Sequence, residues 1–193
     1  RKTKGVRPTV QTRHPGLQLN VFIDGQAATI SYDTSNGPLH ERGYRRQQVV
    51  APIRENLAAG LLILAGYNAA HTVADPCAGS GTFLIEAAMM ATNTPPNVLR
   101  KHFGFMLHPE YTEKRWLEVR SKWLQKRKPL ESKLLGIERD PESYQLLKEN
   151  IARAGFEGKI ELLRADFRTA KLPFEPNFVI TNPPYGKRLS EEK

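Results

Sequence analysis

The chain has 193 residues, 39% of them hydrophobic, a length and composition that suit one domain with a small appendage. No apolar run approaches the ~20 residues that span a membrane, and the single Cys excludes an internal disulfide and favours a reducing, cytoplasmic setting. The net charge of +9 favours a polyanionic partner such as nucleic acid, although a basic solvated surface would explain the charge equally well.

The first 47 residues are predicted to form a basic leader and a β-hairpin. Residues 17–23 alternate apolar and polar types, Asp24 and Gly25 provide a turn, and residues 27–32 continue in β-favouring types. Pro52 is then expected to open a helix. Four apolar residues at helical spacing are expected to face the core: Ile53, Leu57, Leu61 and Leu64.

From residue 48 onward the chain is expected to form a second region, in which strands and helices alternate. Strands are predicted at 72–74, 134–137, 159–163 and 178–180, and helices at 83–91, 110–127 and 141–154. This order predicts an α/β, Rossmann-like fold with a parallel sheet covered on both faces. Ligands bind such sheets beyond the carboxyl ends of the strands. Chemistry-bearing motifs follow all four strands there, which predicts one composite site.

The first motif is the loop from Asp75 to Thr82, Asp-Pro-Cys-Ala-Gly-Ser-Gly-Thr. It lacks the Lys of a phosphate-binding P-loop, and Leu84 stands where a dinucleotide fingerprint needs its third glycine. A ligand that carries a carboxylate and an amine fits better, because Gly79 and Gly81 allow close approach and a helix N-terminus follows. S-adenosylmethionine has this shape. Asp75 would face its ammonium group, and Cys77 and Thr82 belong to the same loop.

Acids end the next two strands. Glu138 is expected to accept hydrogen bonds from the ribose hydroxyls, whereas Asp140, just before Pro141, is expected to cap a helix. Asp166 is a candidate for the adenine amino group, with a helix cap as its alternative, and Phe167 is a candidate to pack on the ring. Cys77 is expected to be inert rather than a nucleophile. The five His and one Cys show no metal-ligand spacing.

The last motif is Asn182-Pro183-Pro184-Tyr185, which follows an apolar strand. The lone pair of an exocyclic or amide nitrogen is delocalised. Two acceptors, the Asn182 side-chain oxygen and the Pro183 carbonyl, would localise this lone pair by accepting hydrogen bonds from both N–H groups. Proline fixes the backbone that holds this carbonyl, and Tyr185 offers a face for stacking. The alternative is an ordinary turn.

Basic residues gather in three places: at the N-terminus, around Tyr44, and on the helix predicted at 110–127. Such clusters are often solvated faces, but mixed with aromatic residues they suit a nucleic-acid backbone and a stacked base. The candidate nucleic-acid contacts are Arg42, Tyr44, Arg45, Arg46, Lys122, Lys126 and Arg127.

These motifs resemble the amino-group class of S-adenosylmethionine-dependent methyltransferases. Two segments resemble more narrowly the THUMP-associated RNA methyltransferases, which include bacterial large-subunit rRNA guanine-N2 methyltransferases. They are residues 39–45, Leu-His-Glu-Arg-Gly-Tyr-Arg, and residues 51–58, Ala-Pro-Ile-Arg-Glu-Asn-Leu-Ala. The resemblance implies a cytoplasmic enzyme that uses S-adenosylmethionine to methylate the N2 of a guanine in 23S rRNA. It also implies an RNA-binding THUMP domain before this region. Ala78 stands where such enzymes often have Cys.

Three other functions stay open. The Asn-Pro-Pro-Tyr motif also resembles DNA adenine-N6 methyltransferases and, less well given the basic charge, the glutamine methyltransferases of release factors. A non-catalytic RNA-binding fragment is the third class. The absence of an initiator Met, and the eight residues after Tyr185, predict a fragment whose sheet is incomplete after its fourth strand.

Overall fold

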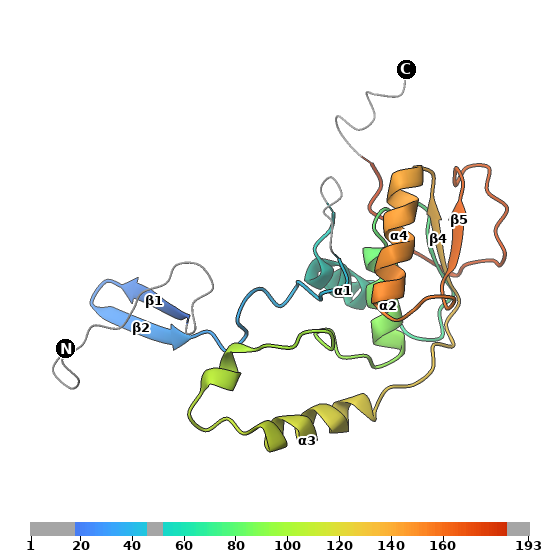
Figure 1. Ribbon diagram of the computed structural model, residues 1–193. Coiled ribbons are helices and arrows are strands. Elements are labelled where there is room, and N and C mark those ends of the chain that lie inside the picture. The colour runs from blue at the N-terminus through green and yellow to red at the C-terminus, as the bar shows by residue number, and fades with distance from the viewer. Residues whose placement is uncertain (1–17, 46–51, 185–193) are drawn as a thin grey trace. The chain divides into compact units, whose positions relative to one another are not determined.

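The structure is a computed structural model that describes residues 18–45 and 52–184. The chain divides into two compact units (Figure 1). The smaller unit consists of the residues up to Pro38 together with Arg100–Arg120. The larger unit contains Leu39–Leu99 and the residues from Ser121 onward. In the described part of the chain, no helix is long and apolar enough to cross a membrane.

The smaller unit contains the predicted hairpin, formed by β1 (Leu19–Asp24) and β2 (Ala27–Tyr32). The strands pair antiparallel with Leu19 opposite Tyr32 and Asp24 opposite Ala27, and Gly25 takes a positive φ of 53° in the turn. The short 3-10 helix η1 (Gly104–Leu107) follows in this unit, and the Tyr32 hydroxyl donates to the Gly104 carbonyl. The hairpin prediction is therefore confirmed.

Helix α3 (Glu113–Leu124) is shorter than the helix predicted at 110–127. The amide of Gln125 still bonds four residues back, to Ser121 O, but the next two bond three residues back, Lys126 N to Trp123 O and Arg127 N to Leu124 O, so the α-helical pattern ends here. The part of α3 in the smaller unit carries Trp116, which packs edge-on against Phe103 and Phe105 with ring centroids 5.4 and 5.0 Å away.

The larger unit is built on a four-stranded parallel sheet in the order β5-β4-β3-β6. Its strands are β3 (Val73–Asp75), β4 (Leu134–Glu138), β5 (Glu161–Arg164) and β6 (Phe178–Val179). Its helices are α1 (Glu55–Leu64), α2 (Thr82–Ala91) and α4 (Pro141–Arg153). The predicted α/β fold with a parallel sheet is confirmed, and β6 lies at an edge of the described sheet.

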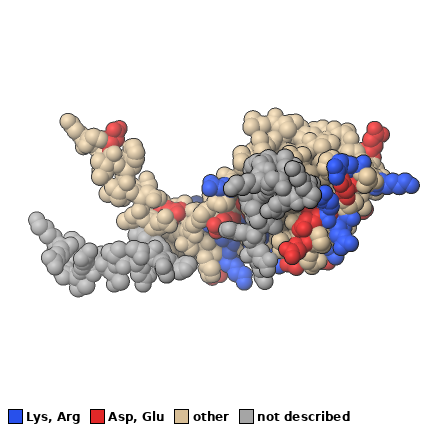
Figure 2. Space-filling model, turned by 90° about the horizontal axis from the view of Figure 1, so that it is seen from above, with Lys and Arg blue, Asp and Glu red and all other residues tan. Residues whose placement is uncertain are grey.

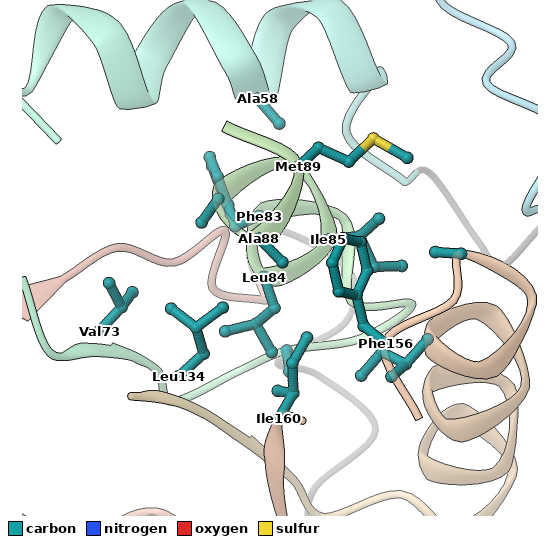
Figure 3. Packing of buried hydrophobic residues seen from close by; sticks show 14 of the residues in the cluster. Ala58, Val73, Phe83, Leu84, Ile85, Ala88, Met89, Leu134, Phe156 and Ile160 are labelled. Atoms are coloured by element: carbon teal, nitrogen blue, oxygen red, sulfur yellow. The ribbon is translucent and has the colours of Figure 1, made fainter. Parts of the chain in front are cut away.

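The main core lies between the sheet and these helices. Val73 and Leu134 of the sheet pack with Leu84 of α2, which is fully buried (Figure 3). Gly136 leaves room for this contact, since a Cβ there would lie 2.6 Å from Leu84 Cδ1. A smaller cluster forms on alternate strand residues, Ala74, Leu135 and Ile137.

The two faces of the sheet are covered in different ways. Helices pack on the face of the main core. On the other face, the smaller cluster is covered by residues of the segment between β5 and β6, including Ala170 and Phe174. The prediction of a sheet covered on both faces is therefore confirmed. The apolar strands did not indicate which segment covers each face, because a helix and a loop bury the same strand residues.

Of the four predicted core residues of the first helix, Ile53 packs against the core as predicted, whereas the other three do not. Leu57, Leu61 and Leu64 are 53%, 38% and 85% exposed, and Ala58 and Leu62 are buried instead. Helix α1 begins at Glu55 rather than at Pro52, and it is apolar on nearly every side. Helical spacing therefore could not select its buried face, and the small Ala58 lies against α2 near Met89 (Figure 3).

Candidate active site

The loop after β3 turns tightly into the N-terminus of α2. Gly81, the N-cap residue, has a φ of 82°, and a Cβ on it would lie 2.5 Å from Leu147 Cδ1. Both facts require glycine at this position. The loop closes through Gly81 N, which donates to Ala78 O at 2.7 Å, and it is anchored to β4 because Ala78 N donates to Ile137 O at 2.9 Å.

Backbone hydrogen bonds bring the four strand-end motifs to one edge of the sheet. Ile180 N donates to Ala74 O at 3.1 Å, which places Thr181 beside Asp75. On the other side, Ala165 N donates to Glu138 O at 3.2 Å, so Asp166 follows directly beside Glu138. The predicted shared position of these motifs is confirmed by the parallel order of the strands.

Asp75 is the most perturbed acid at this edge. It is 1% exposed, and burial raises its pKa to about 7. The negative charge of Glu138 raises the pKa further, whereas the Thr181 hydroxyl and the Cys77 N–H lower it. A buried carboxyl that is close to half-ionised at neutral pH would become fully ionised if a cation were held against it.

Glu138 is joined to the glycine loop. Its Oε2 accepts from Gly79 N at 2.8 Å and its Oε1 from Asp140 N at 2.9 Å. A carboxylate offers about four lone-pair sites, so two further hydrogen bonds can be accepted. Asp140 itself caps α4, with Oδ2 accepting from Ser143 N at 2.7 Å, and these hydrogen bonds lower its pKa. The predicted cap at Asp140 is confirmed.

Asp166 does not cap a helix. Its carboxylate accepts from the backbone N–H of Arg168 at 3.0 Å and forms an ion pair with the Arg168 guanidinium, and these contacts lower its pKa. Phe167, its neighbour, is 50% exposed. Asp166 and Phe167 therefore both lie at the carboxyl edge of the sheet, where a ligand can reach them.

Asn182 lies half-buried directly after β6, and Pro183 and Pro184 are exposed. Tyr185 lies outside the described residues. Cys77 is partly exposed, and burial together with the neighbouring Asp75 raises the pKa of its thiol. A raised pKa keeps the thiol protonated, which agrees with the expectation that Cys77 is not a nucleophile.

The residues around Tyr44 do not fit the expected nucleic-acid surface. Tyr44 is 0% exposed and cannot stack on a base in this structure. Arg42 is buried in an ion pair with Glu86 at 3.2 Å, and Arg45 pairs with Glu55 at 3.5 Å. Sequence reasoning took these cations for surface charges because it could not see the two buried acids opposite them. Arg46 lies outside the described residues.

The basic residues at the end of α3 are exposed as expected. The Lys126 ammonium lies 4.2 Å from the centre of the Trp123 ring, which is 55% exposed, and Lys122 is exposed on the preceding turn. Arg127 is partly engaged, since its Nε donates to Thr94 Oγ1 at 3.1 Å. Figure 2 shows one face of the molecule, on which Lys and Arg lie interspersed with Asp and Glu.

Two contributors to the site were missed by sequence reasoning. Thr181 interacts with Asp75, and its position just before Asn182 was the available signal. Arg45 reaches the first residue of α2, with Nη2 2.6 Å from Thr82 Oγ1, and nothing in the sequence indicated that contact. Among the described residues, no three His, Cys, Asp or Glu side chains are grouped so as to hold a metal ion.

A parallel sheet with a glycine loop after β3, an acid as the last residue of β4 and Asn-Pro-Pro after β6 is the arrangement of the α/β class of methyltransferase domains. The chain belongs to the family described as RMKL-like, methyltransferase domain, whose model matches residues 42–193.

The chain is also similar in sequence and in structure to known methyltransferases. The chain is 36% identical over 192 residues to the ribosomal RNA large subunit methyltransferase K/L of Vibrio campbellii, covering 96% of the chain but 27% of that protein. Among solved structures, SMU.472, a methyltransferase complexed with SAH, matches with a TM-score of 0.81 at 29% identity, over 89% of this chain and 45% of that one. A protein from Listeria monocytogenes, described as a predicted N6-adenine-specific DNA methylase, gives 0.81 at 32% identity, over 91% and 46%.

Proposed function

We propose that the larger unit binds S-adenosylmethionine at the carboxyl edge of its sheet. The observation that carries the proposal is the meeting of Asp75, Gly79 and Glu138 at that edge, where Glu138 holds the Gly79 N–H. The residues suit the cofactor: Asp75 would ionise against its ammonium group, and two acceptor sites of Glu138 are left for its ribose hydroxyls. A Cβ built on Gly79 meets nothing within 4 Å, so the loop has room for a ligand there. Asp166 and Phe167 would contact the adenine.

When bound, S-adenosylmethionine supplies an electrophilic methyl group. The chain's own part would be to orient the acceptor nitrogen. The Asn182 amide oxygen and the Pro183 carbonyl would accept hydrogen bonds from its two N–H groups and so localise its lone pair. Pro183 and Pro184 stiffen this segment, and Tyr185 would stack on the acceptor ring. Transfer would be direct: the bond from the acceptor nitrogen to the methyl carbon would form as the bond from that carbon to sulfur breaks, S-adenosylhomocysteine would leave, and the nitrogen would release one proton to water. Orientation would supply much of the rate.

The acceptor we infer is RNA, specifically the N2 amine of a guanine in 23S rRNA. The K/L-type relatives are named for ribosomal RNA of the large subunit, and the chain carries a net charge of +9. A target base would have to leave its stack to reach Asn182, and this substrate would place the protein in the cytoplasm. The resemblance to THUMP-associated enzymes further implies a separate domain that shares in binding the RNA.

The second candidate is a DNA adenine-N6 methyltransferase. The specific observation for it is the similarity to the Listeria monocytogenes protein, whose description names that activity. Adenine N6 and guanine N2 are both exocyclic amines, so the same Asn182 chemistry would serve either base.

The test is tritiated methyl transfer by the protein at its natural length. Unmodified 23S rRNA, DNA and a release factor are offered side by side, and the labelled nucleotide is identified after digestion. The proposal predicts label in guanine of the rRNA. Label in DNA adenine would establish the second candidate, and no transfer to any acceptor, with RNA still bound, would show a non-catalytic RNA-binding module.

A further inference from the structure

A buried network of charges connects the segment before α1 to the cofactor loop. Arg45 lies at its centre, with a side chain that is 13% exposed. Its Nη2 donates to Thr82 Oγ1 at 2.6 Å and to the Ile53 carbonyl at 3.3 Å, and its Nη1 lies 3.5 Å from Glu55 Oε1. Glu55 is the first residue of α1 and Thr82 the first residue of α2. One guanidinium therefore joins the N-termini of two helices.

The network continues into the loop itself. The Thr82 hydroxyl, which accepts from Arg45, also shares a hydrogen bond with Ser80 Oγ, 3.3 Å away. Ser80 lies between Gly79 and Gly81, and its carbonyl accepts from Asn150 Nδ2 of α4 at 3.0 Å. Thr82 and Ser80 are 3% and 5% exposed, so their hydrogen-bonded hydroxyls lie on the buried side of the loop. Glu138 holds the same loop from β4 through Gly79 N.

The position of this cation is costly for the helix. A positive charge at a helix N-terminus opposes the macrodipole, and an anion at the same place is stabilised. Glu55 offsets part of the charge of Arg45, but α2 still begins beside a guanidinium. A carboxylate bound at the start of α2, as the sequence of the glycine loop predicts for the cofactor, would gain from both the helix and the cation.

We propose that Arg45 is a positioning residue for cofactor binding, which acts through Thr82 and Ser80 to fix the loop and the start of α2. This inference rests on the proposed cofactor site. It reassigns Arg45 from RNA contact, and it assigns to Thr82 an indirect role. Arg42 provides a control of the same residue type, with a side chain that is 9% exposed against 13% for Arg45. It pairs with Glu86, one helical turn beyond Thr82 and away from the loop.

The experiment is calorimetric titration of the chain with S-adenosylhomocysteine, at a temperature where each variant is shown to be folded. Arg45→Met should lower affinity by about 10-fold or more, the loss expected for a charged hydrogen bond, whereas Arg42→Met should leave it within about 2-fold. Hydrogen exchange at the amides of Gly79–Phe83 should speed up in Arg45→Met alone. If Arg45→Met does not fold, Thr82→Val removes the acceptor and keeps the shape, and the same loss of affinity is expected.

Equal affinities in wild type and Thr82→Val, or equal losses in Arg45→Met and Arg42→Met, would overturn the inference. Its failure is separable from failure of the cofactor site. If the unaltered chain does not bind S-adenosylhomocysteine, the proposed function is contradicted first. If it binds and the Arg45 and Thr82 variants bind as well, only the positioning role is lost.

Discussion

At the scale of single residues, the burial of Asp75 makes the free energy of unfolding depend on pH. Its pKa rises to about 7 in the folded chain, from 3.8 in an exposed carboxyl. Between these values the unfolded chain releases the proton while the folded chain retains it, so the free energy of unfolding falls as pH rises from about 4 to 7. Above pH 7 both states are ionised and this contribution is constant.

Asp75→Asn should remove that part of the pH dependence. The amide keeps the shape and carries no charge at any pH, so urea denaturation of the variant should show a smaller fall in unfolding free energy between pH 4.5 and 7 than the wild type. Other acids titrate in both proteins and cancel in the difference. Parallel pH profiles for the two proteins would show that Asp75 ionises normally.

Glu138 tests the ribose contact. Glu138→Ala should weaken binding of S-adenosylhomocysteine by roughly 1–3 kcal/mol, the cost of losing hydrogen bonds to a charged group. Part of this loss belongs to the Gly79 N–H, which Glu138 also holds. Repeating the titration with 2′-deoxy-S-adenosylhomocysteine separates the loss of the ribose contact from the loss of the Gly79 contact. If the wild type and the variant lose the same affinity for the deoxy ligand, the ribose contact lies on another residue.

At the scale of elements, the sequence predicted what local rules decide. The hairpin was correct because Asp24 and Gly25 specify a turn between alternating strands. The start of α4 was correct because Asp140 and Pro141 carry a cap signal. The buried face of α1 was wrong because that helix is apolar on nearly every side, so tertiary contacts alone select the face.

Helix α3 carries the electrostatic prediction. Lys122→Glu with Lys126→Glu should flatten the dependence of RNA affinity on salt, because each lost phosphate contact lowers the slope of log affinity against log salt by roughly 0.7–0.9. Arg127 is left unchanged because it bonds Thr94. Filter binding at several salt concentrations measures the slope.

The control for this experiment is Lys148→Glu with Lys159→Glu, which makes the same charge change at exposed lysines outside α3. It should leave the slope nearly unchanged. If both double variants flatten the slope equally, the effect belongs to net charge and not to α3.

At the scale of the whole molecule, the site residues within the described chain all belong to the larger unit. Their meeting could be predicted because parallel strands place their carboxyl ends on one edge. The buried partners of Arg42 and Arg45 could not be predicted. Glu86 lies 44 residues after Arg42, and Glu55, although nearer to Arg45, is paired with it by no local rule. The hairpin has no Lys or Arg from residue 19 to residue 32, and its surface is largely tan in Figure 2.

The most direct test of the central claim is the effect of Asn182→Ala on methyl transfer by the protein at its natural length. The change removes one proposed acceptor for the amine hydrogens and leaves the glycine loop intact. Affinity for S-adenosylhomocysteine should stay within about 2-fold, and turnover on unmodified 23S rRNA should fall by ~100-fold or more, as when one positioned polar group is deleted. If Asn182→Ala methylates guanine at close to the wild-type rate, the chemistry does not take place at this edge of the sheet.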